Sequence, residues 1–340
     1  MRLLLPALAV LAACAPPAVA PSVPTASVTA DGQTVAVKSG DDAADDPAIW
    51  RNAANPAASL IVGTDKKAGL YVYGLDGRVR DFVDAGRVNN VDLAQTPAGV
   101  IVAASDRADP ANAHIALFRL DTAAARLIKL ARVPAGEGEA YGMCLWATPT
   151  GSSQGALTAF IVIKDGTIRQ IELDVAAGTG RVVRTMKLAT QSEGCVVDPR
   201  TARLYVAEED VGIWRFDARA SGSVQPIKLA GVDGKRLVAD VEGLAIASEG
   251  QGNGGWLVAS SQGDNAYAVW RLADEQYTGR FRIGAGRLGG TEETDGIAAA
   301  TGDFGPAFPD GLMVAQDGSN LPAQNFKLVS WGKAKAAAAR

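Results

Sequence analysis

The sequence is poor in histidine and cysteine, on which much zinc and nucleophilic chemistry depends. It has one histidine, His114, and three cysteines in 340 residues. A single histidine argues against a zinc site. Aromatic residues make up only 6% of the chain, and no long hydrophobic run follows the N-terminal one. The net charge of −4 gives no sign of a nucleic-acid partner.

The N-terminal segment is expected to direct export. Arg2 precedes an apolar run too short to span a membrane, so residues 1–13 are predicted to be a signal peptide. The run ends in Leu-Ala-Ala-Cys, which resembles a bacterial lipobox and predicts lipidation of Cys14. The protein would then be anchored to the cell envelope (outer membrane or periplasm), with the outer membrane preferred over the inner membrane. The alternative is an ordinary secretory signal, which would release the protein. Residues 14–30, rich in Pro, Ala and Ser, are predicted to be a flexible tether.

Residues 31–332 are long enough for one large all-β domain or two smaller ones. Residues 333–340, a Lys- and Ala-rich tail, are predicted to be disordered. Export would permit a disulfide between Cys144 and Cys195, but we expect two buried free thiols.

A repeat organises the domain. No stretch keeps a helical apolar period for three turns, and strand-like runs alternate with Gly, Asp and Asn turns. Six segments begin with an oxygen-bearing residue and continue into a short apolar run. These anchors are Asp46, Asn90, Tyr141, Glu193, Glu242 and Asp295, at steps of 44, 51, 52, 49 and 53 residues. A period near fifty with several strands per repeat predicts an all-β, six-bladed β-propeller. The early run at 33–39 is expected to complete the last blade. A pair of β-sandwiches, the rival fold, would need no fixed period.

In a propeller the innermost strands surround one axis, so the six anchors should form a ring of oxygen donors. Neighbouring residues add further oxygen donors to this ring, namely Asp45, Asn89, Asp92, Glu139 and Asp240. Carboxylates crowded in this way cannot all stay ionised unless cations neutralise them. Oxygen ligands without a His or Cys cluster favour calcium. A lone Asp-Gly would more simply be a solvated turn, but six in register predict a metal site.

A second set of residues is cationic and follows the second strand of the first three repeats. It consists of Lys66 and Lys67, Arg107, and Lys164. The corresponding positions in the fourth and fifth repeats are Glu208, Glu209 and Gln262. Cations at one shared blade position indicate a clamp for an anion, and phosphate suits Lys and Arg. Bound calcium would invert the field of the acidic mouth, so that a phosphate-rich substrate could bridge metal and lysine.

These motifs resemble those of the β-propeller phytases, which are calcium-dependent. The resemblance runs from about residue 40 to Trp331 and rests on "DDPAIW", "TDKKAGLYVY", "NNVD", "YGMCLW", "SEG", "LYVAEEDVGIWRF", "DVEGL", "LVASSQGDNAYAVW", "TDGI" and "GLMVAQDG". It implies a 3-phytase-type phosphoric monoester hydrolase that acts on phytate or calcium–phytate. The chain lacks the Arg-His-Gly stretch of histidine acid phosphatases and a Cys-x5-Arg loop, which agrees with attack by metal-activated water.

The resemblance also assigns residues. It implies several Ca²⁺ ions held by Asp45, Asp46, Asn89, Asn90, Val91 (through its carbonyl), Tyr141, Glu193, Glu209, Asp240, Glu242 and Asp295. It implies substrate contacts from Lys66, Lys67, Arg107, Tyr141, Lys164 and Gln262. The catalytic set is Lys66, Arg107, Tyr141, Lys164 and Glu193.

The chain departs from the family pattern near its last repeat. Gln33 and Ser319 stand where related enzymes tend to carry acidic residues, and "RLGGTEE" lacks a common Asp-Gly pair. We therefore expect a structural calcium site there to be weak or absent.

Two other functions remain open from the residues alone. A six-bladed lactonase or esterase with one central calcium would explain the ring but not the cations. A non-catalytic envelope propeller that binds a partner would explain the tether. Nothing in the sequence indicates an oligomer, so we expect a monomer.

Overall fold

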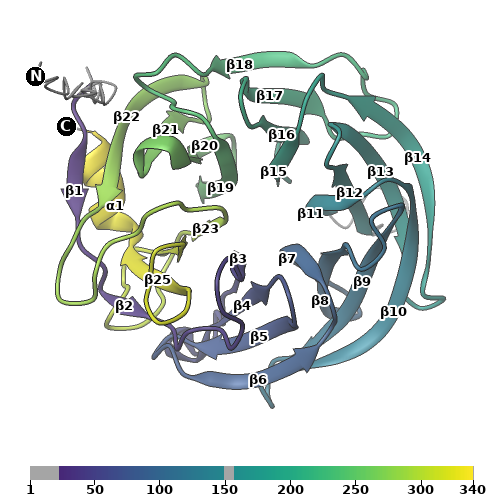
Figure 1. Cartoon of the computed structure of the whole chain (residues 1–340), viewed down its shortest axis with the longest axis horizontal. Helices are drawn as coiled ribbons and strands as arrows, with labels where there is room; N and C mark the ends of the chain where they lie inside the picture. Colours follow the sequence, from purple (N-terminus) through teal and green to yellow (C-terminus); the bar gives the residue numbers. More distant parts are fainter. Residues whose placement is uncertain (1–22, 149–156, 340) are drawn as a thin grey trace, which may run out of the picture.

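Six small antiparallel sheets surround a central axis in the computed structural model, which describes residues 23–148 and 157–339 (Figure 1). The predicted six-bladed β-propeller is confirmed. Within the described part of the chain, no helix has the length and apolar character needed to cross a membrane.

Each blade has four strands, numbered outward from the axis in blades one to five, and blade five carries a fifth strand at its outer edge. Blade one contains β3 (Ala44–Trp50), β4 (Leu60–Asp65), β5 (Gly69–Gly74) and β6 (Val79–Asp84). Blade two contains β7 (Val88–Thr96), β8 (Gly99–Asp106), β9 (Asn112–Asp121) and β10 (Arg126–Glu137). Blade three contains β11 (Ala140–Ala147), β12 (Leu157–Ile163), β13 (Thr167–Asp174) and β14 (Thr179–Lys187).

The remaining blades follow the same plan. Blade four contains β15 (Ser192–Asp198), β16 (Arg203–Glu208), β17 (Gly212–Asp217) and β18 (Ile227–Gly231). Blade five contains β19 (Val241–Glu249), β20 (Gly254–Ser261), β21 (Ala266–Arg271) and β22 (Gln276–Ile283). Blade six contains β23 (Ile297–Ala300), β24 (Leu312–Asp317), β25 (Asn325–Ser330) and, at its outer edge, β2 (Gly32–Gln33). Single-turn 3-10 helices cover Pro56–Ala58 (η1) and Gln262–Asp264 (η2).

The hydrophobic core lies between blades rather than in the centre. Six clusters of buried side chains occur, one at each junction of neighbouring blades. Between blades two and three, for example, Ile101 and Leu117 pack with Met143 and Ile161. Both faces of the central strands are therefore buried, which explains their nearly continuous apolar runs.

Glycines explain how the innermost strands come so close to one another. A Cβ on Gly142 would lie 1.8 Å from the carbonyl oxygen of Glu193, and one on Gly194 would lie 2.2 Å from that of Glu242. A Cβ on Gly243 would lie 2.6 Å from the carbonyl oxygen of Asp295. The residue after these anchors must therefore be glycine, because the backbone of the next blade occupies the space of a side chain.

The N-terminal strands close the ring, as the sequence predicts. β2 pairs with β25, and the backbone contact continues where Thr34 N donates to Phe326 O at 2.9 Å. The predicted tether is wrong at its C-terminal end, because β1 (Ala26–Val28) adds a parallel strand to β22. This strand satisfies backbone groups on the exposed edge of blade five. The rest of the tether, the signal peptide and Cys14 lie outside the described residues.

The C-terminal tail is not disordered over 333–338 but belongs to helix α1 (Trp331–Ala338), which packs at the junction of blades five and six (Figure 1). Trp331, Ala334 and Ala337 are buried there. Alanine is the strongest helix former, and alanines with Trp331 give the helix an apolar side, so composition alone was a poor guide to disorder.

Cys144 and Cys195 form a disulfide instead of the expected free thiols. The bond joins β11 to β15, the innermost strands of blades three and four, with 5.7 Å between the Cα atoms. Their separation of 51 residues is one repeat period, so equivalent positions in adjacent blades bring the thiols together. The repeat could therefore have predicted the pairing.

Candidate active site at the propeller mouth

A polar cavity of about 510 Å³ opens at one end of the axis, lined by side chains from five of the six blades. Nine residues predicted for the site line it, namely Asp45, Lys66, Tyr141, Glu193, Glu209, Asp240, Glu242, Gln262 and Asp295. They come from the starts of inner strands, from the residues just before those strands, and from the turns after second strands. The acidic run at the start of the first repeat therefore contributes one blade's residues to a shared cavity.

Three glutamates form the centre of this cavity. Glu193, Glu209 and Glu242 are buried, and each offers a carboxylate oxygen within 4.8 Å of the other two. Among the described residues, Glu209 Oε1 and Glu242 Oε2 are buried without a hydrogen-bond partner, as is Asp45 Oδ1 nearby. A buried acceptor without a donor is costly, so these oxygens require protons or a cation.

The carboxyl groups of this cluster have raised pKa values. Burial raises the pKa of Glu242 well above its ordinary value, and the charges of Glu193 and Glu209 raise it further. Burial likewise raises the pKa of Glu193, with Asp45 and Asp295 adding to the effect. Several carboxyl groups in one enclosed space disfavour ionisation of each other.

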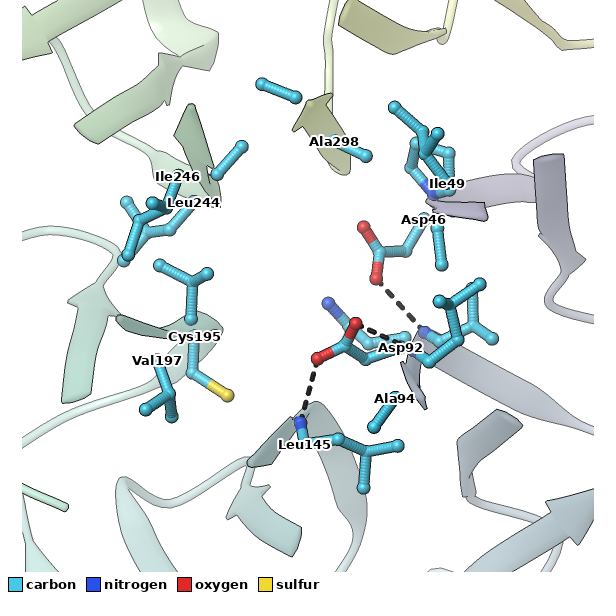
Figure 2. Close-up of a pocket in the computed structure, with 18 of the residues that line it drawn as sticks. Asp46, Ile49, Asp92, Ala94, Leu145, Cys195, Val197, Leu244, Ile246 and Ala298 are labelled. Carbon is cyan, nitrogen blue, oxygen red and sulfur yellow. Dashed lines mark hydrogen bonds between the residues drawn. The ribbon is translucent and has the colours of Figure 1, made fainter. Parts of the chain in front are cut away.

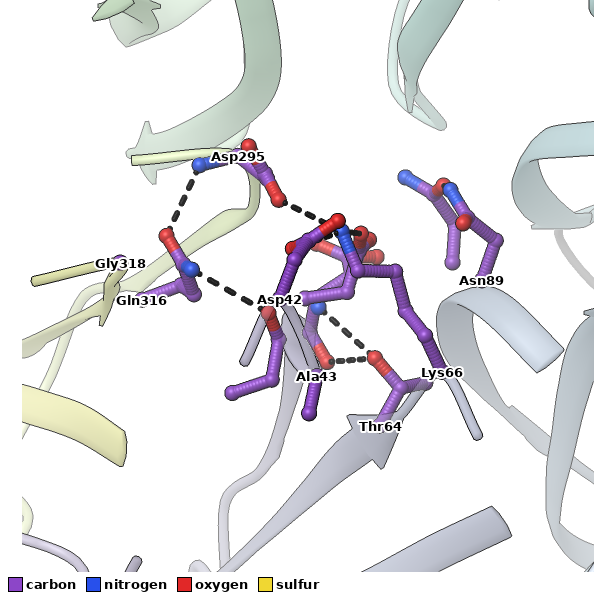
Figure 3. Close-up of polar contacts among 12 residues, drawn as sticks. Asp42, Ala43, Thr64, Lys66, Asn89, Asp295, Gln316 and Gly318 are labelled. Carbon is purple, nitrogen blue, oxygen red and sulfur yellow. Dashed lines mark hydrogen bonds and ion pairs between the residues drawn. The ribbon is translucent and has the colours of Figure 1, made fainter. Parts of the chain in front are cut away.

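Lys66 joins the acidic groups of blades one and six (Figure 3). Its ammonium lies 3.0 Å from Asp295 Oδ2 and 3.2 Å from Asp45 Oδ2. Burial opposes the charge of Lys66, but the facing aspartates outweigh it and raise its pKa. Burial and the charge of Asp45 raise the pKa of Asp295 to about 7, although Lys66 lowers it. A cation is thus already placed beside two predicted metal ligands.

Sequence reasoning missed Asp42, which also binds Lys66. The ammonium lies 2.5 Å from Asp42 Oδ1, although this aspartate side chain is 71% exposed. It falls in the acidic run before the first anchor, so its position carried the signal. Gln262, which was predicted, donates to Asp295 Oδ1 at 2.7 Å.

The other two predicted cations flank Tyr141. Arg107 Cζ and Lys164 Nζ lie 5.2 and 5.0 Å from the centre of its ring, which suits cation–π contacts. Arg107 Nε donates to Glu139 Oε1 at 2.8 Å, and its Nη1 donates to Asn89 Oδ1 at 2.5 Å. These cations therefore stand beside the cavity.

Asn89 connects blade two to the acidic cluster, because its Nδ2 donates to Glu193 Oε1 at 3.0 Å. Lys67 does not line the cavity. Its ammonium donates to Gly40 O at 2.6 Å, and its side chain is half-exposed.

Three predicted calcium ligands, Asp46, Asn90 and Val91, line a second cavity of about 340 Å³ along the axis (Figure 2). Asp46 Oδ2 accepts from Val91 N at 3.0 Å. Asp92 Oδ2 accepts from Leu145 N at 2.8 Å, and burial raises its pKa to about 6. These carboxylates tie neighbouring inner strands to one another, below the cavity at the mouth.

The departures noted near the last repeat surround a buried lysine. Lys327 Nζ donates to Gln33 Oε1 at 2.7 Å and to Asn320 Oδ1 at 3.0 Å. It also lies 3.2 Å from Asp317 Oδ2. An ammonium group therefore occupies the oxygen-lined space beside Gln33, which gives a physical reason to expect little calcium binding there.

The fold and the site together define a six-bladed β-propeller whose mouth holds a buried carboxylate cluster that could bind a metal, with lysine and arginine beside it. The chain belongs to the phytase family, whose model, described as "Phytase", matches residues 1–339. It is 39% identical to the 3-phytase of Bacillus subtilis (strain 168) over 323 residues, which cover 89% of this chain and 83% of the relative.

Similar solved structures show the fold alone. Kuenenia stuttgartiensis hydrazine synthase matches with a TM-score of 0.53 at 12% identity, over 83% of this chain and 82% of that one. A chain of the mitotic checkpoint complex matches with a TM-score of 0.52 at 16% identity, over 95% of this chain and 85% of that one.

Proposed function

We propose that this protein is a calcium-dependent phytase that removes phosphate from myo-inositol hexakisphosphate at the propeller mouth. One observation carries the proposal: buried, unpaired carboxylate oxygens of Asp45, Glu209 and Glu242 share a cavity with Lys66. Divalent cations would satisfy these oxygens without protonating them, and such cations beside a lysine would attract phosphate. Membership of the phytase family and the similarity to the 3-phytase of Bacillus subtilis support this substrate.

The donor set of the mouth fits calcium. Its cavity offers carboxylate, amide and phenol oxygens, and no described residue lining it is a histidine or cysteine. Hard oxygen ligands of this kind suit Ca²⁺. The ions would be held by Asp45, Tyr141, Glu193, Glu209, Asp240, Glu242 and Asp295. Asn89 would support Glu193, whereas Asp46, Asn90 and Val91 would act from the channel side. Calcium bound by these residues would supply a water of lowered pKa and neutralise phosphate oxygens.

The chain's own side chains bind and orient the substrate. Lys66 lies between Asp45 and Asp295, where its ammonium can donate to a phosphate oxygen and stabilise charge that develops on it. Arg107 and Lys164 flank Tyr141 and would hold a second phosphate of the same substrate. Gln262 orients Asp295. A water activated by bound calcium would be the nucleophile, so no covalent phospho-enzyme is needed.

Phosphate release from phytate, measured at neutral to mildly alkaline pH with and without Ca²⁺, tests the proposal. We expect release that is lost after exhaustive chelation and returns with added Ca²⁺. Full activity of the calcium-stripped protein would refute calcium dependence. Lactone hydrolysis without phosphate release would instead assign an esterase-type propeller, and inactivity on both substrates would assign a binding protein.

We also propose that the protein is exported as a monomer and anchored through a lipid on Cys14. This rests on the sequence alone, because Cys14 lies outside the described residues. Labelled palmitate should be incorporated by cells that express the wild type and not by cells that express Cys14→Ser. Release of unlabelled wild type into the medium would favour ordinary secretion. A dimer in light scattering would refute the monomer.

A further inference from the structure

Gln191 is bound to Glu209 at two points. It lies between β14 and β15 and lines the cavity at the mouth. Its side-chain Nε2 donates to Glu209 Oε2 at 2.7 Å, and its backbone carbonyl accepts from Glu209 N at 3.1 Å. The same Nε2 lies 3.4 Å from the hydroxyl of Tyr141. One amide therefore connects a carboxylate of the three-glutamate cluster with the phenol of the neighbouring blade.

The turn that carries Gln191 is itself held firmly. Glu208 Oε1 accepts from Ala189 N at 2.9 Å and from Thr190 N at 2.7 Å. Its other oxygen accepts from Trp214 Nε1 at 2.7 Å. The two adjacent glutamates thus have different tasks. Glu208 builds the turn, and Glu209 faces the cavity. A fixed turn means that the Gln191 amide has little freedom to follow Glu209 if that side chain moves.

The contact leaves one oxygen of Glu209 free. With Oε2 held by Gln191, Glu209 Oε1 is buried without a hydrogen-bond partner. The carboxylate lies in the cluster with Glu193 and Glu242. A donor on one oxygen fixes the rotamer and aims the other oxygen, as outer partners do for metal ligands.

We propose that Gln191 is a positioning residue that holds Glu209 ready to bind a divalent cation and couples it to Tyr141. The inference rests on the proposed function, because it assigns Gln191 a task only if the cluster holds Ca²⁺. Loss of such an outer partner commonly costs 10- to 100-fold in metal affinity. Gln191→Met keeps the length of the side chain but removes the donor, so its Ca²⁺ dissociation constant should rise by about 10- to 100-fold.

Calorimetric titration of the calcium-stripped full-length protein with Ca²⁺ alone measures this effect without activity. The matched control is Gln276→Met, a glutamine at the exposed start of β22, which should bind Ca²⁺ like the wild type. At saturating Ca²⁺, phytate KM of Gln191→Met should stay within about twofold of the wild type. Its metal-free melting temperature should fall by about 2–6 °C, because Glu209 Oε2 loses its donor.

A double-mutant cycle separates positioning from a general structural effect. In a Glu209→Gln background the carboxylate is gone, so Gln191→Met should cost little further affinity, and the two changes should be strongly non-additive. Additive losses would overturn the inference. Unchanged Ca²⁺ affinity in Gln191→Met would also overturn it, as would loss of folding in both Gln191→Met and Gln191→Ala. A wild type that binds no Ca²⁺ would instead overturn the proposed function.

Discussion

Replacement of the buried Lys327 by methionine should destabilise the propeller strongly. The lysine side chain is only 1% exposed and its partner Asp317 only 7%. Methionine fills most of the same space but leaves the Asp317 carboxylate buried without its cation. Removing one member of a buried ion pair costs about 3–5 kcal/mol. At about 2 °C per kcal/mol for a domain of this size, the melting temperature should fall by about 6–10 °C.

Scanning calorimetry or urea denaturation of the variant measures this cost. Lys187→Met is the control, because its ion pair with Asp165 is exposed on both sides and should contribute less than about 1 kcal/mol. The double variant Lys327→Met/Asp317→Asn removes both charges and should recover part of the stability. Equal melting temperatures for Lys327→Met and Lys187→Met would show that the buried Lys327–Asp317 ion pair stabilises blade six no more than an exposed pair does.

Four further predictions concern the mouth, the disulfide and the last repeat. Lys66→Ala should lower phytate turnover by at least about 100-fold while circular dichroism stays native; wild-type turnover would remove its role in phosphate binding. Folding raises the pKa of Asp295 from 3.8 to about 7. The metal-free protein should therefore lose stability as pH rises from about 4 to 7, by about 4 kcal/mol from this group. A metal-free melting temperature that rises over this range would contradict the prediction. Reduction of the Cys144–Cys195 disulfide, which closes a loop of 51 residues, should cost about 4 kcal/mol by loop entropy, seen in denaturation with and without a reductant; a Cys-to-Ala double variant is the control and should not respond. Chelation should lower the melting temperature less than in a family member that has acidic residues at positions 33 and 319, and an equal shift would contradict the assignment of Lys327.

The repeat made the fold predictable, because six oxygen-bearing anchors at nearly equal steps leave few architectures open. The same register predicted several of the residues that line the mouth, including Glu193, Glu242 and Asp295. It did not separate residues that face the mouth from residues that face the channel, as with Asp46. That distinction depends on where each inner strand begins to pair, and strand positions one residue apart point in opposite directions.

Other features were invisible because they depend on contacts rather than on residue type. Gln191 follows no repeat, and its importance comes from the side chains that it contacts. Asp42 lies in the acidic run of the first repeat, but the run did not reveal its contact with Lys66. The sequence did not reveal helix α1, because an alanine-rich segment becomes ordered only where it can pack on an apolar surface, and that surface is formed by blades five and six. The repeat could have predicted the disulfide, because the two cysteines are one period apart. The expectation of free thiols considered only their burial.

Because the N-terminal strand β2 pairs with the C-terminal strand β25, the propeller cannot close before the chain is almost fully synthesised. β2 must wait for its partner β25, the last strand to be synthesised, so the ring of blades closes only when almost the entire polypeptide is available. A chain that ends before Asn325 would keep every acidic residue yet leave Asp295 on a blade that β25 and β2 do not close. Truncated products should therefore be inert and easily degraded, instead of retaining a fraction of the hydrolytic activity.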